Sequence, residues 1–221
     1  MAGMADRLKR LEFRLRLAIE DPLSRAYDAA HGVETAREEP LGEVGVASRD
    51  IKRGNSLYRV TWGSLIDQAM RRLDIDHARY VFLDYGSGKG KAMLMAADYP
   101  FRSIIGLEYA QRLHEVAVAN CQSYHSPDQQ CRDLQPMLTD VMDYAPPPGP
   151  IVCFMCNPFD EATMGQVFDQ WRARHDRGET DIRIMYLNMR TVDEMAALLD
   201  RQDWLRPVAK AKRFTILAPR G

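Results

Sequence analysis

Three glycines lie two residues apart in the stretch V-F-L-D-Y-G-S-G-K-G-K, which begins at Val81. Closely spaced glycines cost backbone entropy and pack little, so they are typical of a strand-to-helix turn where a ligand approaches the main chain. The turn would be formed by Gly86, Ser87, Gly88 and Gly90. Asp84 precedes it and could accept hydrogen bonds from backbone amides or from an ammonium group of a ligand, or cap the next helix.

The spacing of the glycines excludes two common nucleotide-binding loops. A P-loop, G-x-x-x-x-G-K-[ST], would need a glycine where the chain has Leu83 or Tyr85. A dinucleotide-binding loop, G-x-G-x-x-G, would need its third glycine at Lys91. The pattern that remains, D-x-G-x-G-x-G, resembles the first motif of class I S-adenosylmethionine-dependent methyltransferases.

Acidic residues follow two further predicted strands. Glu108 ends the apolar stretch 103–108, and one carboxylate there can accept from both hydroxyls of a ribose, so Glu108 and its neighbour Tyr109 indicate a nucleoside site. NAD sites use the same device, so Glu108 alone does not name the nucleoside. The methyltransferase resemblance implies that Asp140 accepts from the adenine amine and that the amide of Val141 meets the ring. Asp143 competes with Asp140 for that role.

The tripeptide Asn157-Pro158-Phe159 follows the fourth predicted strand. It resembles the D/N-P-P-Y/F motif of amino-group methyltransferases, whose side-chain and backbone oxygens hold an NH group while the aromatic ring packs on the substrate. The resemblance therefore implies catalytic roles for these three residues, with Asn157 also beside the cofactor. The chain has one proline where the motif has two, so the target amine stays open. The alternative is a strand-ending turn with Phe159 in the core.

Tyr58 and Thr61 precede the first predicted helix of the main domain. They resemble the Y-x-x-T segment that many of these enzymes place over the methionine end of the cofactor. Thr61 could instead cap the helix, and both side chains could be ordinary packing residues. The segments H-G-V-E-T at 31–35 and D-Y-P-F-R at 98–102 also resemble small bacterial class I methyltransferases of unassigned substrate.

Strand and helix patterns alternate from Leu57 onward, which predicts a parallel sheet with helices on both faces. The predicted strands are 80–84, 103–108, 137–140, 151–156 and 182–187, followed by a hairpin of 204–210 and 212–218 around Ala211. The predicted helices are 62–73, one after the glycines that stops before Pro100, 110–123, 161–174 and 192–201. The resemblance implies a doubly wound, Rossmann-like α/β sheet of seven strands, mostly parallel, with an antiparallel strand from the C-terminal hairpin.

Residues 1–56 are predicted to form an N-terminal helix and capping segment, and residues 57–221 the S-adenosylmethionine-binding domain. Leu8, Leu11, Leu15 and Ile19 recur at three- and four-residue steps among basic residues, which predicts an amphipathic helix over 5–20. Its basic face could be solvated, or could meet a membrane surface or an acidic partner. Residues 31–56 are expected to be an irregular connector that helps cap the ligand edge of the sheet.

The composition predicts a soluble cytoplasmic protein. A chain of 221 residues, 46% hydrophobic, can fold unaided, and its net charge of −1 argues against an overall electrostatic grip on nucleic acid. We see no apolar run near the ~18 residues of a membrane span and no signal-peptide core. The C-x-x-C pair Cys153 and Cys156 lies in an apolar strand, and the histidines are scattered, so no metal site is predicted.

Together these features predict an S-adenosylmethionine-dependent methyltransferase that acts on a nitrogen nucleophile of a protein or small molecule. Transfer from a sulfonium to a neutral amine mainly requires alignment of the reacting atoms, and no histidine or lysine stands out as the base that an alcohol would need. The alternative is a non-catalytic, regulatory protein that binds an adenosine cofactor. The identity of the acceptor and the oligomeric state are not predicted.

Overall fold

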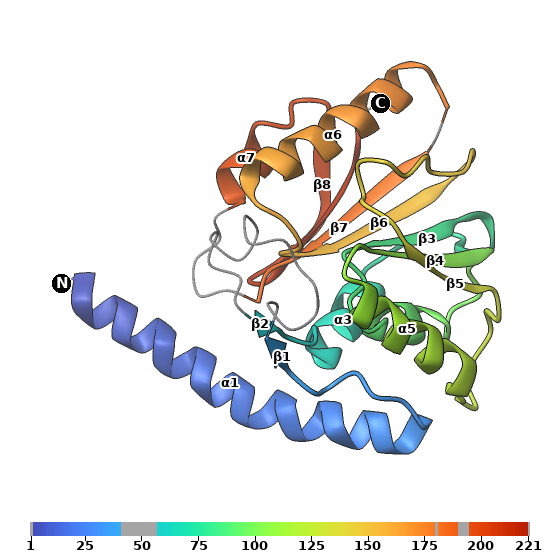
Figure 1. The fold of residues 1–221 in the computed structure, drawn as a ribbon. Helices are drawn as coiled ribbons and strands as arrows, with labels where there is room; N and C mark the ends of the chain where they lie inside the picture. Colours follow the sequence, from blue (N-terminus) through green and yellow to red (C-terminus); the bar gives the residue numbers. More distant parts are fainter. Residues whose placement is uncertain (1, 41–56, 180, 190–194, 221) are drawn as a thin grey trace.

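A mixed sheet of seven strands forms the centre of the computed structural model, which describes residues 2–40, 57–179, 181–189 and 195–220 (Figure 1). The strands are β3 (Val81–Tyr85), β4 (Ser103–Glu108), β5 (Leu134–Leu138), β6 (Ile151–Cys156), β7 (Ile182–Leu187), β8 (Leu205–Ala211) and β9 (Phe214–Pro219). Their order is β5-β4-β3-β6-β7-β9-β8, with β9 antiparallel to both of its neighbours and the other pairs parallel. The predicted fold class is confirmed.

Helices cover both faces of this sheet (Figure 1). On one face, α3 (Gly63–Met70) and α4 (Lys91–Ala96) pack in a core around Trp62 and Phe82. On the other, α6 (Glu161–Asp176) and α7 (Ala196–Asp200) pack in a second core around Trp171 and Leu83. The α5 helix (Gln111–Ser123) contacts β4 and β5, and a short 3-10 helix, η2 (His77–Arg79), precedes β3. Because the inner parallel strands are buried on both sides, their sequences are nearly continuous apolar runs.

The predicted strands differ from the structure mainly at the edge of the sheet. The bounds 103–108, 151–156 and 182–187 are confirmed, and the first strand begins one residue later than predicted. The prediction of a strand at 137–140 is wrong, because β5 spans Leu134–Leu138. This strand is at the sheet edge, where Pro136 is tolerated and where its mostly exposed side chains leave no clear apolar pattern. The hairpin turn lies at Lys212 and Arg213 rather than at Ala211.

Two helix predictions also need correction. The predicted helix 62–73 is shorter in the structure, and Trp62 occupies the position before α3 without a side-chain cap, so Thr61 does not cap the helix. The predicted helix 192–201 appears as α7, Ala196–Asp200, and residues 192–194 lie outside the described residues.

The N-terminal helix α1 (Ala2–His31) is longer than the predicted 5–20 and runs along the α3 side of the molecule (Figure 1). Phe13 of α1 packs against Trp62, and Tyr27 packs in the same core. After α1, the short strand β1 (Glu39–Pro40) pairs antiparallel with β2 (Leu57–Tyr58). Residues 2–40 are thus packed on the sheet domain. From residue 41 onward, the predicted connector 31–56 lies outside the described residues, and the proposed division at residue 57 remains a prediction.

A buried lysine lies where α1 meets α4. The Nζ atom of Lys91, the first residue of α4, is 3.2 Å from the ring centroid of Tyr27 and 3.8 Å from Oδ1 of Asp28. Burial lowers the pKa of Lys91 to about 7, although the carboxylates of Asp28 and Glu20 favour its charged form. The Lys91 amine therefore binds a proton less readily in the folded protein than in the unfolded chain.

A glycine in β4 lets the turn after β3 pack closely on the sheet. A Cβ atom at Gly106 would overlap the Sδ atom of Met93 and lie 2.8 Å from the Cβ atom of Ser87. In contrast, a Cβ atom at Gly165 in α6 would meet nothing within 4 Å.

We predict that Gly106→Ala lowers the free energy of unfolding by about 1–3 kcal/mol, because the added methyl must displace Met93 or Ser87. The matched Gly165→Ala should instead raise it by up to about 1 kcal/mol, because alanine is the better helix former. Urea denaturation of both variants measures the difference. A Gly106→Ala protein as stable as the wild type would contradict the close packing of Met93 and Ser87 on Gly106.

We predict that the free energy of unfolding rises between pH 7 and 9 by up to about 1.4 kcal/mol per pH unit on account of Lys91. Its folded pKa lies below its unfolded pKa, so over this range the unfolded chain binds more protons. Lys91→Met should be more stable at pH 7 and lack this part of the rise, whereas Lys9→Met, at an exposed position of α1, should keep it. Denaturation at several pH values gives the change in the free energy of unfolding per pH unit. An equal change in all three proteins would show that Lys91 does not cause the rise.

Candidate functional site at the carboxyl edge of the sheet

Strand register brings the predicted site residues to one edge of the sheet. Tyr85 at the end of β3 pairs with Leu107 of β4 and with Met155 of β6. The residues that follow these three positions include Gly86, Glu108 and Asn157. The chain order reverses between β3 and β6, and ligands of doubly wound sheets bind at such a reversal.

The glycine turn between β3 and α4 depends on left-handed backbone. Gly86, Gly88 and Gly90 have φ values of 79°, 53° and 87°, which side-chain-bearing residues rarely adopt. The amides of Gly86 and Ser87 donate to the carbonyl of Leu107 at 2.9 and 3.0 Å, and the amide of Gly90 donates to the carbonyl of Ser87 at 2.8 Å. Because these amides already have acceptors, the turn offers a ligand close approach rather than free donors.

The Glu108 carboxylate joins this turn to the end of β4. Its Oε2 accepts from the amide of Gly88 and its Oε1 from the amide of Ala110, both at 2.8 Å. Burial raises the pKa of Glu108, against the opposing effect of these amide bonds. Each carboxylate oxygen has a further lone pair, so the group can still accept from ligand hydroxyls.

Two buried polar side chains, those of Asp84 and Ser87, lie beside the glycine turn. Asp84 is 3% exposed, and burial together with the charge of Glu108 raises the pKa of Asp84 well above its usual value. Among the residues that the structure describes, the buried Oγ of Ser87 has no hydrogen-bond partner. A buried carboxyl group and a buried hydroxyl of this kind are suited to a polar ligand with an ammonium or carboxylate group.

The predicted adenine-binding pair lies just beyond β5. Oδ1 of Asp140 accepts from the amide of Met142 at 2.9 Å, and the Asp140 carbonyl accepts from the amide of Asp143 at 3.1 Å. Asp140 is exposed, whereas Val141 is buried in the core beneath α6. The amide of Thr139 donates to the carbonyl of Glu108 at 3.0 Å, so this loop lies directly beside the end of β4. Tyr109, which follows Glu108, is 42% exposed.

The side chain of Asn157 is bonded to the neighbouring strand and the residues after it. Its Nδ2 donates to the hydroxyl of Tyr186 at 2.8 Å, and its Oδ1 accepts from the amide of Met189 at 2.9 Å. Asn157 has a φ of 46°, an unusual value for a residue other than glycine. The next residue, Pro158, lies against the glycine turn, since its Cβ is 3.0 Å from where a Cβ at Gly86 would be. Phe159 is half-buried against the core beneath α6.

Tyr58 covers the other side of the turn. A Cβ atom at Gly88 would lie 2.5 Å from the Cε2 atom of Tyr58, so only glycine fits beneath the ring. The Tyr58 hydroxyl donates to the carbonyl of Thr35 at 3.3 Å, and burial raises its pKa. Thr61 is half-buried, three residues further along the chain.

Lys89 links the residues after α1 to the glycine turn. No sequence pattern pointed to this residue. It is fully buried, and its Nζ donates to the side chain of Glu34 at 2.7 Å and to the carbonyl of Arg37 at 3.0 Å. Its Nζ also lies 2.8 Å from Oε1 of Glu39, a buried carboxylate. The Asn120 side chain reinforces this link by bonding the backbone of both Glu34 and Lys89. A lysine between two glycines gives no sequence signal for such burial.

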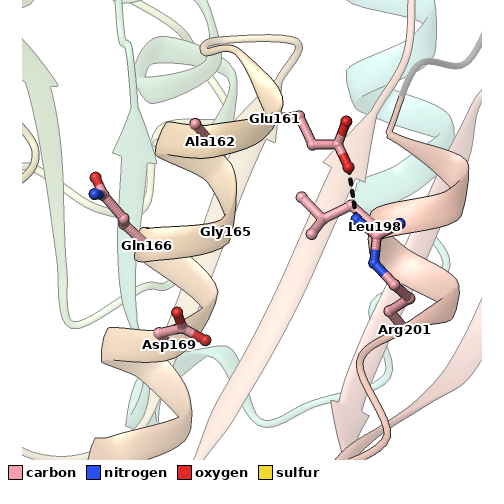
Figure 2. Close-up of a pocket in the computed structure, with 7 residues that line it drawn as sticks. All are labelled: Glu161, Ala162, Gly165, Gln166, Asp169, Leu198 and Arg201. Atoms are coloured by element: carbon pink, nitrogen blue, oxygen red, sulfur yellow. Dashed lines mark hydrogen bonds and ion pairs between the residues drawn. The ribbon is translucent and has the colours of Figure 1, made fainter.

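Other parts of the described structure contain fewer groups that could bind a ligand or take part in a reaction. A depression of about 520 Å³ lies between α6 and α7, and its lining includes Glu161 and Arg201, which form an ion pair (Figure 2). It contains none of the predicted site residues. Among the described residues, no three His, Cys, Asp or Glu side chains are grouped as metal ligands, and no disulfide joins any of the four cysteines. No helix in the described parts of the chain is long and apolar enough to cross a membrane.

Comparison with known proteins identifies the fold. No protein-family model matches the chain, and no curated protein does either. Among solved structures, a methyltransferase from Pseudomonas syringae is similar over 71% of this chain and 97% of its own, with a TM-score of 0.51 and 16% identity. A ribosomal protein L11 methylase from Lactobacillus delbrueckii subsp. bulgaricus is similar over 71% of this chain and 77% of its own, with a TM-score of 0.50 and 11% identity. The chain therefore has the seven-stranded fold of class I S-adenosylmethionine-dependent methyltransferases, as the glycine motif predicts.

Proposed function

We propose that this protein is an S-adenosylmethionine-dependent methyltransferase that acts on a nitrogen atom of a protein or small molecule. The observation that carries the proposal is the contact between the glycine turn and Pro158 at the reversal between β3 and β6. It brings the candidate cofactor site and the candidate acceptor site together at the edge where this fold binds ligands.

The polar groups beside the turn fit the parts of this cofactor. Glu108 would accept from the ribose hydroxyls, and Asp140 with the Val141 amide would hold the adenine. Asp84 and the unbonded hydroxyl of Ser87 would meet the methionine end, with Tyr58 and Thr61 forming a wall. The exposed ring of Tyr109 lies beside the proposed ribose site. When bound, the cofactor supplies a methyl group attached to a sulfonium sulfur. The sulfur is an activated leaving group, because it departs as a neutral thioether.

Asn157 would position the acceptor. Its bonds to Tyr186 and Met189 fix the side-chain amide, and its Oδ1 retains a second lone pair that can accept from an N–H group. The Pro158 carbonyl would accept a second N–H bond, and Phe159 would pack beside the acceptor. A neutral amine attacks with its own lone pair, so these groups need only hold it in line with the methyl group. The nitrogen would release its extra proton to solvent.

The proposed class of acceptor and the proposed compartment are supported by the sequence alone. The near-neutral net charge supports a protein or small-molecule acceptor over nucleic acid, and the cytoplasm remains the predicted compartment. Another solved structure with this type of fold is an RNA methyltransferase from Salinibacter ruber in complex with S-adenosyl-L-homocysteine, and its TM-score of 0.45 is too low to bear on the acceptor.

We predict that S-adenosylhomocysteine at a hundred times its dissociation constant raises the melting temperature by roughly 5–10 °C, and that NAD does not. Asp84→Asn should reduce this shift, because the amide cannot balance the charge of an ammonium group. The same variant should be at least as stable as the wild type without ligand at pH 7, because burial disfavours the charged carboxylate.

The control for this experiment is Asp169→Asn, at an exposed position of α6, which should change neither the stability nor the shift. A shift with NAD alone would overturn the proposed cofactor. A full shift in Asp84→Asn would remove Asp84 from the site.

We predict that Asn157→Gly keeps the S-adenosylhomocysteine shift and lowers methyl transfer by about 10²-fold or more, because the acceptor loses its alignment. Glycine tolerates the left-handed backbone at this position, so the variant isolates the side chain. Tritium transfer from labelled S-adenosylmethionine into a host-cell lysate, separated into protein, nucleic acid and small molecules, measures the activity. Equal transfer by both proteins would exclude Asn157, and ligand binding by the wild type without transfer to any fraction would favour the non-catalytic alternative.

A further inference from the structure

The N-terminal helix exposes an apolar stripe. Its members are large aliphatic side chains of α1 that are between 53% and 70% exposed, namely Met4, Leu8, Leu11, Leu15, Ile19 and Leu23. They recur at three- and four-residue steps, so they lie on one side of the helix over about 28 Å. A continuous exposed apolar surface of this length marks an interaction site.

A different face of α1 binds the domain, so the stripe is not needed to hold the helix in place. Phe13 lies 5.8 Å from Trp62 between ring centroids, and the buried Glu20 accepts a hydrogen bond from Ser64. Near the end of the helix, Asp28 accepts from the backbone and hydroxyl of Thr35. The stripe therefore remains exposed on the folded protein.

The charges around the stripe are unevenly distributed. Three carboxylates of α1 are engaged by the protein itself: Glu12 pairs with Lys212, Glu20 pairs with Arg16, and Asp28 bonds to Thr35. The exposed basic side chains of the helix are Arg7, Lys9, Arg10, Arg14 and Arg25. Arg7, Arg14 and Arg25 follow at steps of seven and eleven residues, so they lie along one edge of the stripe, together with the half-buried Asp21. The exposed side of α1 is thus apolar, with a border in which three arginines outnumber one aspartate.

The pattern does not suit pairing with a second copy of the helix. A two-stranded coiled coil needs apolar residues at alternating steps of three and four over several heptads. Here the series Met4, Leu8, Leu11 and Leu15 would continue at Ala18, Pro22 and Arg25, which cannot sustain the contact. In an antiparallel pair, the arginine edge of one copy would also face the same edge of the other.

We propose that α1 lies flat on an anionic phospholipid surface, with the stripe among the acyl chains and the basic border at the headgroups. An amphipathic helix with these properties binds in the plane of a bilayer. The domain would remain on the aqueous side, held through the face of Phe13 and Glu20. The stripe is separate from the glycine turn, so this proposal and the proposed methyltransferase activity can fail independently.

The test is sedimentation of the full-length protein with vesicles of phosphatidylcholine alone and of phosphatidylcholine with phosphatidylglycerol. We expect binding to the anionic vesicles that falls as salt is raised from 0.1 to 0.5 M, roughly tenfold or more. The double variant Leu11→Gln and Leu15→Gln should weaken this binding by about tenfold or more, because two apolar side chains no longer enter the bilayer. Val208→Gln, an exposed apolar position in β8, is the matched control and should bind as the wild type does.

The oligomeric state of the same proteins, measured by light scattering, separates the main alternatives. Binding to anionic vesicles that the double variant loses, with monomers of both proteins in solution, would support the proposal. A wild-type dimer that the double variant converts to monomers, without vesicle binding, would show that a second copy covers the stripe and would overturn it. Absence of vesicle binding, or equal binding by the double variant, would overturn it as well.

Discussion

The hydrogen bonds that the Glu108 carboxylate accepts from Gly88 and Ala110 hold the candidate site together. Through them, the end of β4, the glycine turn after β3 and the start of α5 form one unit. The turn can adopt its left-handed path because Gly86, Gly88 and Gly90 carry no side chain. It fits against its neighbours because Gly88 leaves room for the Tyr58 ring and Gly106 leaves room for Ser87. A residue with a side chain at either glycine would separate Glu108 from the turn or push the turn away from the sheet.

Residues between the end of α1 and β1 also hold the glycine turn in place, through their contacts with Lys89. Lys89 is fully buried, and the side chain of Glu34 and the buried carboxylate of Glu39 surround its ammonium group. A buried ion pair of this kind contributes little net stability, but loss of one partner leaves an uncompensated charge. We infer that the pair fixes where the N-terminal segment lies rather than how stable the protein is. The position of Tyr58 over Gly88 depends on the same arrangement, since Tyr58 pairs with Glu39 between β2 and β1.

The sequence predicted the inner sheet well because burial on both faces gives β4, β6 and β7 continuous apolar runs. It missed the true bounds of β5 because that edge strand is mostly exposed and contains Pro136. It placed Glu108 and Asn157 at strand ends, but their bonding partners could not be predicted. The partners Tyr186 and Met189 of Asn157 come from β7 and the segment after it, and contacts so distant in sequence leave no local pattern. The orientation of α1 was also not predictable, because it depends on single contacts such as that of Phe13 with Trp62.

The most direct test of the central claim is a crystal structure of the protein with S-adenosylhomocysteine. We expect the ribose hydroxyls at the carboxylate of Glu108, the amino-acid end beside Asp84 and Ser87, and the sulfur facing Asn157. Ligand density at this edge in that orientation would establish the cofactor site. Ligand bound elsewhere, or no ligand at this edge in crystals grown with saturating ligand, would contradict it.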